Sequence, residues 1–221
     1  MTMKNNKTIL FIIFFSQLTV FAFGQDSKIE IPTFNDKYSK YVQQLENDKL
    51  NIDYADFRNS FLKSKQFEKK GTNYDNLKKQ VYVEIKNKNY QEIIRLTKSM
   101  LSIDYTSMFA HKYLQQTYKI LGDTANQIKY HDIEFGLLNS IIKSGDGKTC
   151  KTGWHVTQIE EEYFILNMIG EEFQEQSISS EGKNACDKMI VKKVKQELII
   201  WKPIKYLSKN KNYLENKLHA S

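Results

Sequence analysis

The sequence predicts an α+β protein in which a series of paired helices is followed by a small antiparallel sheet with one helix. Apolar residues recur at helical spacing from about residue 33 to residue 143, and after Gly145 they alternate as in strands. The 221 residues include only 2 prolines and 9 glycines, so few positions force a break in a helix. A hydrophobic content of 40% with 13% aromatic residues indicates a folded chain with a sizeable core.

Residues 1–24 have the pattern of a secretory signal peptide. Lys4 and Lys7 form a short basic start, an apolar run extends from Ile9 to Val20, and the segment ends in Ala22-Phe23-Gly24. The run is shorter than the ~20 residues that a membrane span needs, which favours cleavage over an uncleaved anchor. No cysteine follows directly, so a lipid anchor is not expected. The sequence therefore predicts an exported protein, periplasmic or extracellular, that starts at Gln25 and keeps no integral membrane span.

Export changes the interpretation of the charge. The formal net charge of +7 falls to +5 without Lys4 and Lys7, because residues 1–24 contain no other charged residue. Lysines and acids are interleaved along the rest of the chain, as in "FLKSKQFEKK", which is typical of a solvated surface. Nucleic-acid binding would need basic residues gathered on one face, so nucleic acid is excluded as a partner.

Residues 25–143 are predicted to be helical. In "NYDNLKKQVYVEIKNK", Leu77, Val81 and Ile85 stand four residues apart and share one stripe of a helix. Three similar patterns follow, with Gly122 as a helix stop and Thr124 as the expected N-cap of the fourth helix. These four helices are expected within residues 73–88, 90–103, 107–123 and 124–145, and earlier helices within 36–48 and 53–67.

The four helices form two pairs with a period near 34 residues, the offset that separates Ile94 from Ile128. The second pair resembles the tetratricopeptide repeat in Leu114, Tyr118 and Gly122, which have the spacing of that family's first-helix leucine, tyrosine and turn glycine. The resemblance implies a front half of tetratricopeptide-like helical hairpins. Stacked hairpins of this kind present a concave groove that binds peptides or protein segments.

Residues 144–206 are predicted to form a small α+β unit packed on the helices, before a polar tail at 207–221. The linker loop contains Gly145, Asp146 and Gly147, with Gly145 expected in a left-handed helix cap and the next two residues in a tight turn.

Three strands and one helix are expected after this loop. Strand patterns occur in "GWHVTQI", "KMIVKK" and "ELIIWKPI", and Pro203 is consistent with an edge position in the last one. Between the first two strands, "EEEYFILNMIG" predicts a helix that Gly170 ends.

Two candidate ligand sites in this half fail on spacing. A phosphate-binding loop at Gly147-Lys148-Thr149 would need another glycine five residues earlier, where the chain has Ile142. His155 with the glutamates at 160–162 lacks the i, i+4 helical geometry that brings two strong metal ligands together. These glutamates are interpreted as solvated acids at the start of a helix. The sequence thus predicts no cofactor, no metal and no catalytic residue.

Three segments carry a second resemblance: "GLLNSIIKSGDGKT", "WHVTQIEEEYFIL" and "DKMIV". They are similar to an uncharacterised domain-of-unknown-function family of exported Gram-negative bacterial proteins, over roughly Tyr54 to Ile204. The resemblance implies a helical front, a loop and a helix leading into a small sheet, together with export. It implies no activity and no catalytic residue.

The two cysteines, Cys150 and Cys186, both lie in predicted loops that flank the sheet-containing half. Because an exported chain meets an oxidising compartment, we expect them to form a disulfide.

A non-enzymatic protein- or peptide-binding module of the cell envelope fits these observations. Four tyrosines are candidates to line its groove: Tyr82, Tyr90, Tyr113 and Tyr130. For each of them, a place in the core between helices is the alternative. An envelope hydrolase with a site near Asp146 and His155, between the helices and the sheet, is the alternative function. A purely structural role in the envelope is a third.

Overall fold

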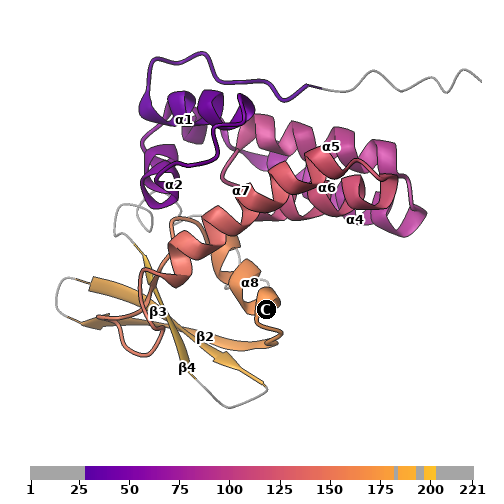
Figure 1. Ribbon diagram of the computed structural model, residues 1–221. Coiled ribbons are helices and arrows are strands. Elements are labelled where there is room, and N and C mark those ends of the chain that lie inside the picture. Colours follow the sequence, from indigo (N-terminus) through magenta and orange to yellow (C-terminus); the bar gives the residue numbers. More distant parts are fainter. Residues whose placement is uncertain (1–27, 182–183, 193–196, 203–221) are drawn as a thin grey trace, which may run out of the picture.

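The structure is a computed structural model that describes residues 28–181, 184–192 and 197–202. It has a helical layer followed by a small sheet with one helix, which confirms the predicted α+β class (Figure 1). The predicted signal peptide, the cleavage site before Gln25, Pro203 and the polar tail lie outside the described residues. Within the described ranges, no helix combines the length and the apolar character needed to cross a membrane.

Each of the first three helices begins after a polar residue that caps it. They are α1 (Lys37–Glu46), α2 (Tyr54–Leu62) and α3 (Lys65–Lys69). Their N-caps are Asp36, Asp53 and Ser64, whose side chains accept hydrogen bonds from backbone N–H groups in the first turn. Such caps satisfy donors that the helix itself leaves unpaired. The helices α1 and α2 lie within the expected segments, whereas α3 extends two residues beyond the end of the segment 53–67.

Four longer helices follow: α4 (Thr72–Asn87), α5 (Tyr90–Ile103), α6 (Met108–Leu121) and α7 (Thr124–Ile142). Consecutive members pack side by side, as helical hairpins require (Figure 1). Gly122 ends α6 with a left-handed φ of 77°, which glycine adopts without steric cost. The cap of α7 is Asp123, whose carboxylate accepts from Asn126 N, and the predicted cap Thr124 is the first helical residue. The tetratricopeptide likeness itself stays a prediction.

The core of the helical layer is rich in aromatic rings. Tyr38 of α1 stacks on Phe57 of α2, with ring centroids 5.6 Å apart, and it also contacts Phe61. The hydroxyl oxygen of Tyr38 accepts a hydrogen bond of 2.8 Å from the backbone N–H of Tyr105, in the turn between α5 and α6. Because these rings are almost fully buried, they fix α1 and α2 against the hairpins that follow.

In the linker loop, the glycine with the left-handed backbone conformation is not the one that the sequence predicts. Gly147 has a φ of 70°, whereas Gly145 is not left-handed, so its predicted cap role is wrong. Gly145 is instead required by close packing, since a Cβ there would overlap the carbonyl oxygens of Thr152 and Gly153. The N–H groups of Asp146 and Gly147 donate to Thr152 O at 2.8 and 3.1 Å, and Asp146 Oδ1 accepts from Thr152 Oγ1 at 2.6 Å. These bonds close the loop on itself.

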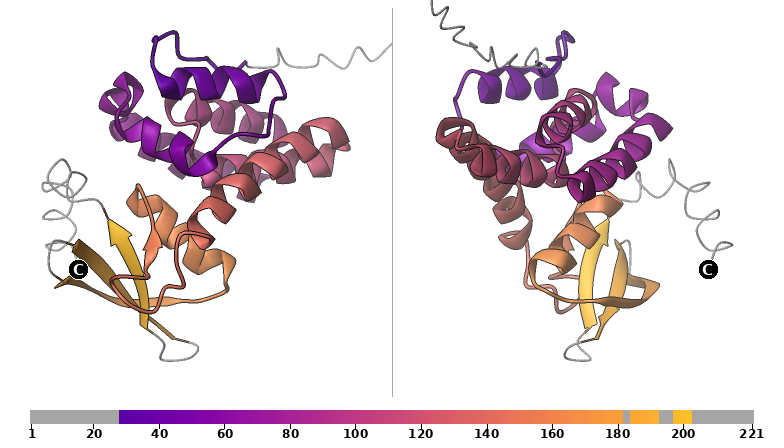
Figure 2. Two further views of the ribbon diagram at one scale, coloured as in Figure 1. Left: turned by 60° about the vertical axis from the view of Figure 1, so that its left-hand side comes forward. Right: turned by 90° about the vertical axis from the view of Figure 1, so that its right-hand side faces the viewer.

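The sheet contains β1 (Trp154–His155), β2 (Phe173–Glu181), β3 (Asn184–Val191) and β4 (Glu197–Lys202), in the order β1-β4-β3-β2. The pairs β2–β3 and β3–β4 are antiparallel, but β1 is parallel to β4. A small antiparallel sheet was expected; β2, β3 and β4 form one, and the two-residue β1 adds a parallel pair at the edge of β4. Figure 2 shows that the sheet lies at one side of the helical layer.

The strand β2 was not expected from the sequence. Its segment "FQEQSISSE" has two large apolar residues, Phe173 and Ile178, and both are exposed. An edge strand with a solvated surface needs no apolar alternation, so the usual strand signal is missing. A register shift between Phe173 and Glu175 interrupts the periodicity further.

The helix α8 (Ile159–Met168) lies where the sequence predicts a helix, but two of its glutamates are buried instead of solvated. Glu161 and Glu162 are 3% and 0% exposed, so the prediction of three solvated acids is wrong for two of them. The physical reason for Glu161 is an arginine from another helix. Arg58 of α2 is itself only 2% exposed and meets Glu161 in a buried ion pair.

This ion pair joins four elements. Arg58 Nε and Nη2 donate to the two carboxylate oxygens of Glu161 at 2.9 and 3.0 Å, a bidentate geometry. The same guanidinium donates to Ser140 Oγ of α7 at 3.0 Å and to His155 O of β1 at 2.7 Å. Glu161 also accepts from the backbone N–H and the hydroxyl of Thr157. The helical layer and the sheet unit therefore share one buried, hydrogen-bonded polar cluster.

Removing one member of this pair should strongly destabilise the protein. Arg58→Met leaves a buried carboxylate without its cation, which costs about 3–5 kcal/mol of unfolding free energy. Urea unfolding measures this loss, and Arg95→Met is the control, because the Arg95–Glu92 pair is solvent-exposed and should matter by about 1 kcal/mol or less. Equal stability of the two variants would show that the cluster does not hold the layers together.

A disulfide joins Cys150 of the linker loop to Cys186 of β3, with the two Cα atoms 5.6 Å apart. It closes a loop of 37 residues, counted inclusively from the sequence separation of 36.

Thiol labelling of the denatured, unreduced protein should find no free thiol, and two free thiols would refute the bond. On the chain-entropy model, Cys150→Ser/Cys186→Ser should lose about 3–4 kcal/mol of stability in urea unfolding.

Candidate functional site

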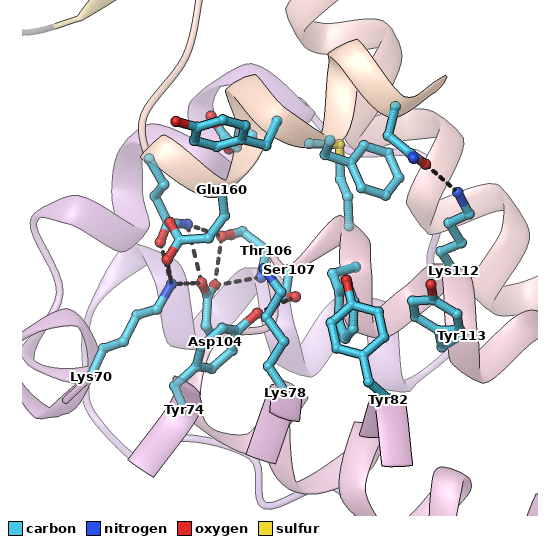
Figure 3. Close-up of a pocket in the computed structure, with 17 residues that line it drawn as sticks. Lys70, Tyr74, Lys78, Tyr82, Asp104, Thr106, Ser107, Lys112, Tyr113 and Glu160 are labelled. Atoms are coloured by element: carbon cyan, nitrogen blue, oxygen red, sulfur yellow. Dashed lines mark hydrogen bonds and ion pairs between the residues drawn. The ribbon is translucent and has the colours of Figure 1, made fainter. Parts of the chain in front are cut away.

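A cleft of about 200 Å³ lies between α4, α6 and α8 (Figure 3). Its floor comes from the turn between α5 and α6, and its walls from side chains of the three helices. The two ends of the cleft differ in chemistry: one is a closed polar network, and the other combines aromatic rings with lysines.

The polar end is a network centred on Lys70, just before α4. Lys70 Nζ donates to Asp104 Oδ2 at 2.8 Å and to Gln158 Oε1. Gln158 Nε2 in turn donates to Asp104 Oδ2 at 3.1 Å and to Thr106 Oγ1 at 3.0 Å. Because Gln158 directly precedes α8, these bonds fix the start of that helix against the α5–α6 turn.

The charges of this network reinforce one another. Burial alone would lower the pKa of the Lys70 ammonium, but the carboxylates of Asp104 and Glu160 raise it well above its ordinary value. Burial also raises the pKa of the nearby Tyr74 hydroxyl, which is hydrogen-bonded to Ser107. Lys70 is therefore charged throughout the physiological range and is already neutralised by groups of the protein.

The aromatic wall consists of Tyr82 from α4 with Phe109 and Tyr113 from α6. The ring centroids of Tyr82 lie 5.3 Å from Phe109 and 6.1 Å from Tyr113, and Phe109 and Tyr113 are 4.6 Å apart. Phe109 and Tyr113 share one face of α6 because they stand four residues apart. Tyr82 is 46% exposed, so this wall offers aromatic surface to a ligand.

Lys112 occupies the end of the cleft opposite Lys70 (Figure 3). Its Nζ donates to Asn167 Oδ1 of α8 at 3.0 Å and contacts Met168 Sδ at 3.7 Å. It also lies 5.5 Å from the ring centroid of Phe164, a cation–π distance. These contacts hold the ammonium in place with neutral groups.

A buried carboxyl on α7 lies within electrostatic range of Lys112. Glu134 is 1% exposed, and its Oε2 accepts a long hydrogen bond of 3.5 Å from Gln115 Nε2. Burial raises the pKa of Glu134 to about 7, against the opposing effect of the Lys112 ammonium.

The structure brings two of the four candidate tyrosines together in the cleft, Tyr82 and Tyr113. Tyr90 is half-buried at the start of α5 and lines no part of the cleft. Tyr130 is a core residue, 4% exposed, and it stacks on Tyr118 with ring centroids 5.9 Å apart. Tyr130 therefore lies in the core between helices, which was the alternative to a place in the groove.

The residues of the alternative hydrolytic site lie outside this cleft. Asp146 Oδ1 accepts from Lys148 N and Thr152 Oγ1, so its carboxylate shapes the linker loop. His155 is half-buried in β1, and burial together with the Arg58 guanidinium lowers its pKa. In the described part of the chain, no three His, Cys, Asp or Glu side chains are grouped so that they could hold a metal ion.

A family model described as a domain of unknown function (DUF4919) matches residues 28–211. The chain belongs to the DUF4919 family. No curated protein and no solved structure matches the chain. The resemblance drawn from the sequence to an uncharacterised domain family is thus confirmed, and the DUF4919 match spans the helical layer, the sheet and both sides of the cleft.

Titration of Glu134 in the DUF4919 domain should make stability fall as the pH rises. Its folded-state pKa of about 7 exceeds the ordinary value of 4.5, so folding favours the protonated form. The stabilisation is complete below pH 4.5 and is lost as the pH rises through about 7. Glu134→Gln, which mimics the neutral acid, should therefore gain stability over the wild type across this window.

The measurement is urea unfolding of both proteins at several pH values. The buried His111, whose pKa burial lowers to about 4, titrates in an overlapping range, but its contribution cancels in the difference between the two curves. A difference between Glu134→Gln and the wild type that does not change with pH would contradict the assignment.

Proposed function

We propose that the protein is a non-enzymatic protein- or peptide-binding module of the cell envelope, and that the cleft between α4, α6 and α8 holds part of its partner. The observation that supports this most is the aromatic wall with the exposed ring of Tyr82. Aromatic residues in a concave site are the usual anchors of protein interfaces. They add contact area with little loss of side-chain freedom.

The size of the cleft supports a peptide side chain as the ligand. Its volume of about 200 Å³ is below the ~300–1,000 Å³ of pockets that enclose drug-sized molecules or cofactors. One side chain inserted from a partner, with flanking residues on the rim, needs less room.

The envelope location in this proposal rests on the sequence of residues 1–24 alone. Binding is proposed in preference to hydrolysis near Asp146 and His155 because the Asp146 carboxylate is engaged by its own loop. A hydrolytic activity lost in His155→Ala at unchanged stability would reverse that preference.

Panning a random-peptide phage library on the protein tests the proposal. Enriched peptides should lose most of their affinity for Tyr82→Ala, since truncating an aromatic anchor removes about 2 kcal/mol or more of binding free energy. Tyr90→Ala is the matched control, a tyrosine outside the cleft, and should bind as the wild type does. Tyr130→Ala should lower the melting temperature most, because truncating a core aromatic costs about 3–5 kcal/mol.

The proposal fails if no peptide is enriched, or if the enriched peptides bind Tyr82→Ala and the wild type equally. Circular dichroism of Tyr82→Ala confirms that any lost binding is not a loss of folding.

A further inference from the structure

We infer that the cleft is built for an acidic peptide segment, in which a carboxylate stands next to an aromatic or large apolar side chain. Lys112 pairs with the carboxylate and the aromatic wall receives the side chain. This inference rests on the proposed function and specifies its ligand.

The distribution of charge in the cleft is the first argument. Three carboxylates line it: Asp104, Glu160 and Glu161. Asp104 is 2.8 Å from Lys70, and Glu160 lies 4.0 Å from the same ammonium. The carboxylates other than Glu161 are thus gathered at the Lys70 end.

Glu161 forms an ion pair with Arg58, which does not line the cleft, so Glu161 adds no net charge to it. The opposite end contains Lys112, and Lys78 lies 5.0 Å from the ring centroid of Phe109 between the two ends. The residues that line the aromatic side of the cleft thus include lysines and no carboxylate, which complements an acidic ligand.

The second argument is the hydrogen-bonding capacity of Lys112. An ammonium has three N–H donors. One is directed to Asn167 Oδ1, and a second makes only a weak contact with Met168 Sδ at 3.7 Å. Contacts with α8 already fix the position of the ammonium. A carboxylate that accepts from its remaining N–H therefore costs little side-chain entropy of Lys112.

The third argument is the position of the apolar surface relative to this charge. Lys112 and Tyr113 are adjacent in α6, and Tyr82 lies beside Tyr113 in the same wall (Figure 3). Phe164 lies under the Lys112 ammonium. A ligand that placed only a carboxylate here would leave the rings in water, and one that placed only an apolar group would leave Lys112 without an anion inside the cleft. An acid next to an aromatic side chain satisfies both.

Two small probes test the inference without knowledge of the natural partner. N-acetyl-L-phenylalanine has a carboxylate beside an aromatic ring, and N-acetyl-L-phenylalaninamide differs only in being neutral. Each is titrated into the ¹⁵N-labelled protein while the amide signals of α6 and α8 are followed by NMR. We expect both probes to shift these signals, with millimolar affinity for the acid and about tenfold weaker binding of the amide.

Two variants assign the preference to Lys112. Lys112→Gln should bind the acid and the amide with affinities within about twofold of each other. Lys119→Gln is the matched control, an exposed lysine two turns further along α6, and should keep the tenfold preference. The comparison of the two probes on the wild type needs no variant, so it stands even if Lys112→Gln folds poorly.

Equal binding of the two probes at the cleft would overturn the inference and leave the proposed function intact. An unchanged preference in Lys112→Gln would do the same. If neither probe shifts the signals of α6 and α8, the cleft accepts no aromatic group, and the proposed function falls with the inference.

Discussion

The buried ion pair between Arg58 and Glu161 is the interaction on which the relative position of the two layers depends. A guanidinium in a nearly dry interior is tolerated only if it finds acceptors there, and here each of its three nitrogens donates to an acceptor of α7, β1 or α8. Because α2 supplies the cation, the α+β unit can dock on the helical layer in one orientation only. An apolar contact of the same area would have tolerated sliding, whereas a bidentate pair fixes direction as well as distance.

The second polar cluster, around Lys70 and Asp104, completes this arrangement at the other side of α8. Arg58 fixes the first turn of α8 through Glu161, and the side chain of Gln158, the residue before α8, binds the α5–α6 turn. With its start fixed twice, α8 projects Phe164 and Asn167 towards α6. The shape of the cleft therefore depends on polar contacts at the start of α8, away from its aromatic wall.

The sequence predicted most of the helical layer because each of its helices carries its own signal. Apolar spacing located α4 to α7, and Gly122 marked a true stop. The error at Thr124 is a local shift of one residue in the helix cap, whereas two larger errors come from tertiary partners. Glu161 reads as a solvated helix-start acid until Arg58, 103 residues away, is known to meet it. The strand β2 is held by its backbone pairing with β3, which leaves no trace in its side chains.

For the cleft, Tyr82 and Tyr113 were among the candidates, but Lys112 and Phe164 were missed because only the fold brings α8 to α6. The helix α8 also lies between Cys150 and Cys186, inside the covalent ring that their bond closes, whereas α4 and α6 lie outside it. A disulfide restricts mainly the unfolded chain, and here it restricts only the segment that supplies one wall of the cleft. Reduction should therefore widen the range of conformations open to α8 in the unfolded protein and leave that of α4 and α6 unchanged.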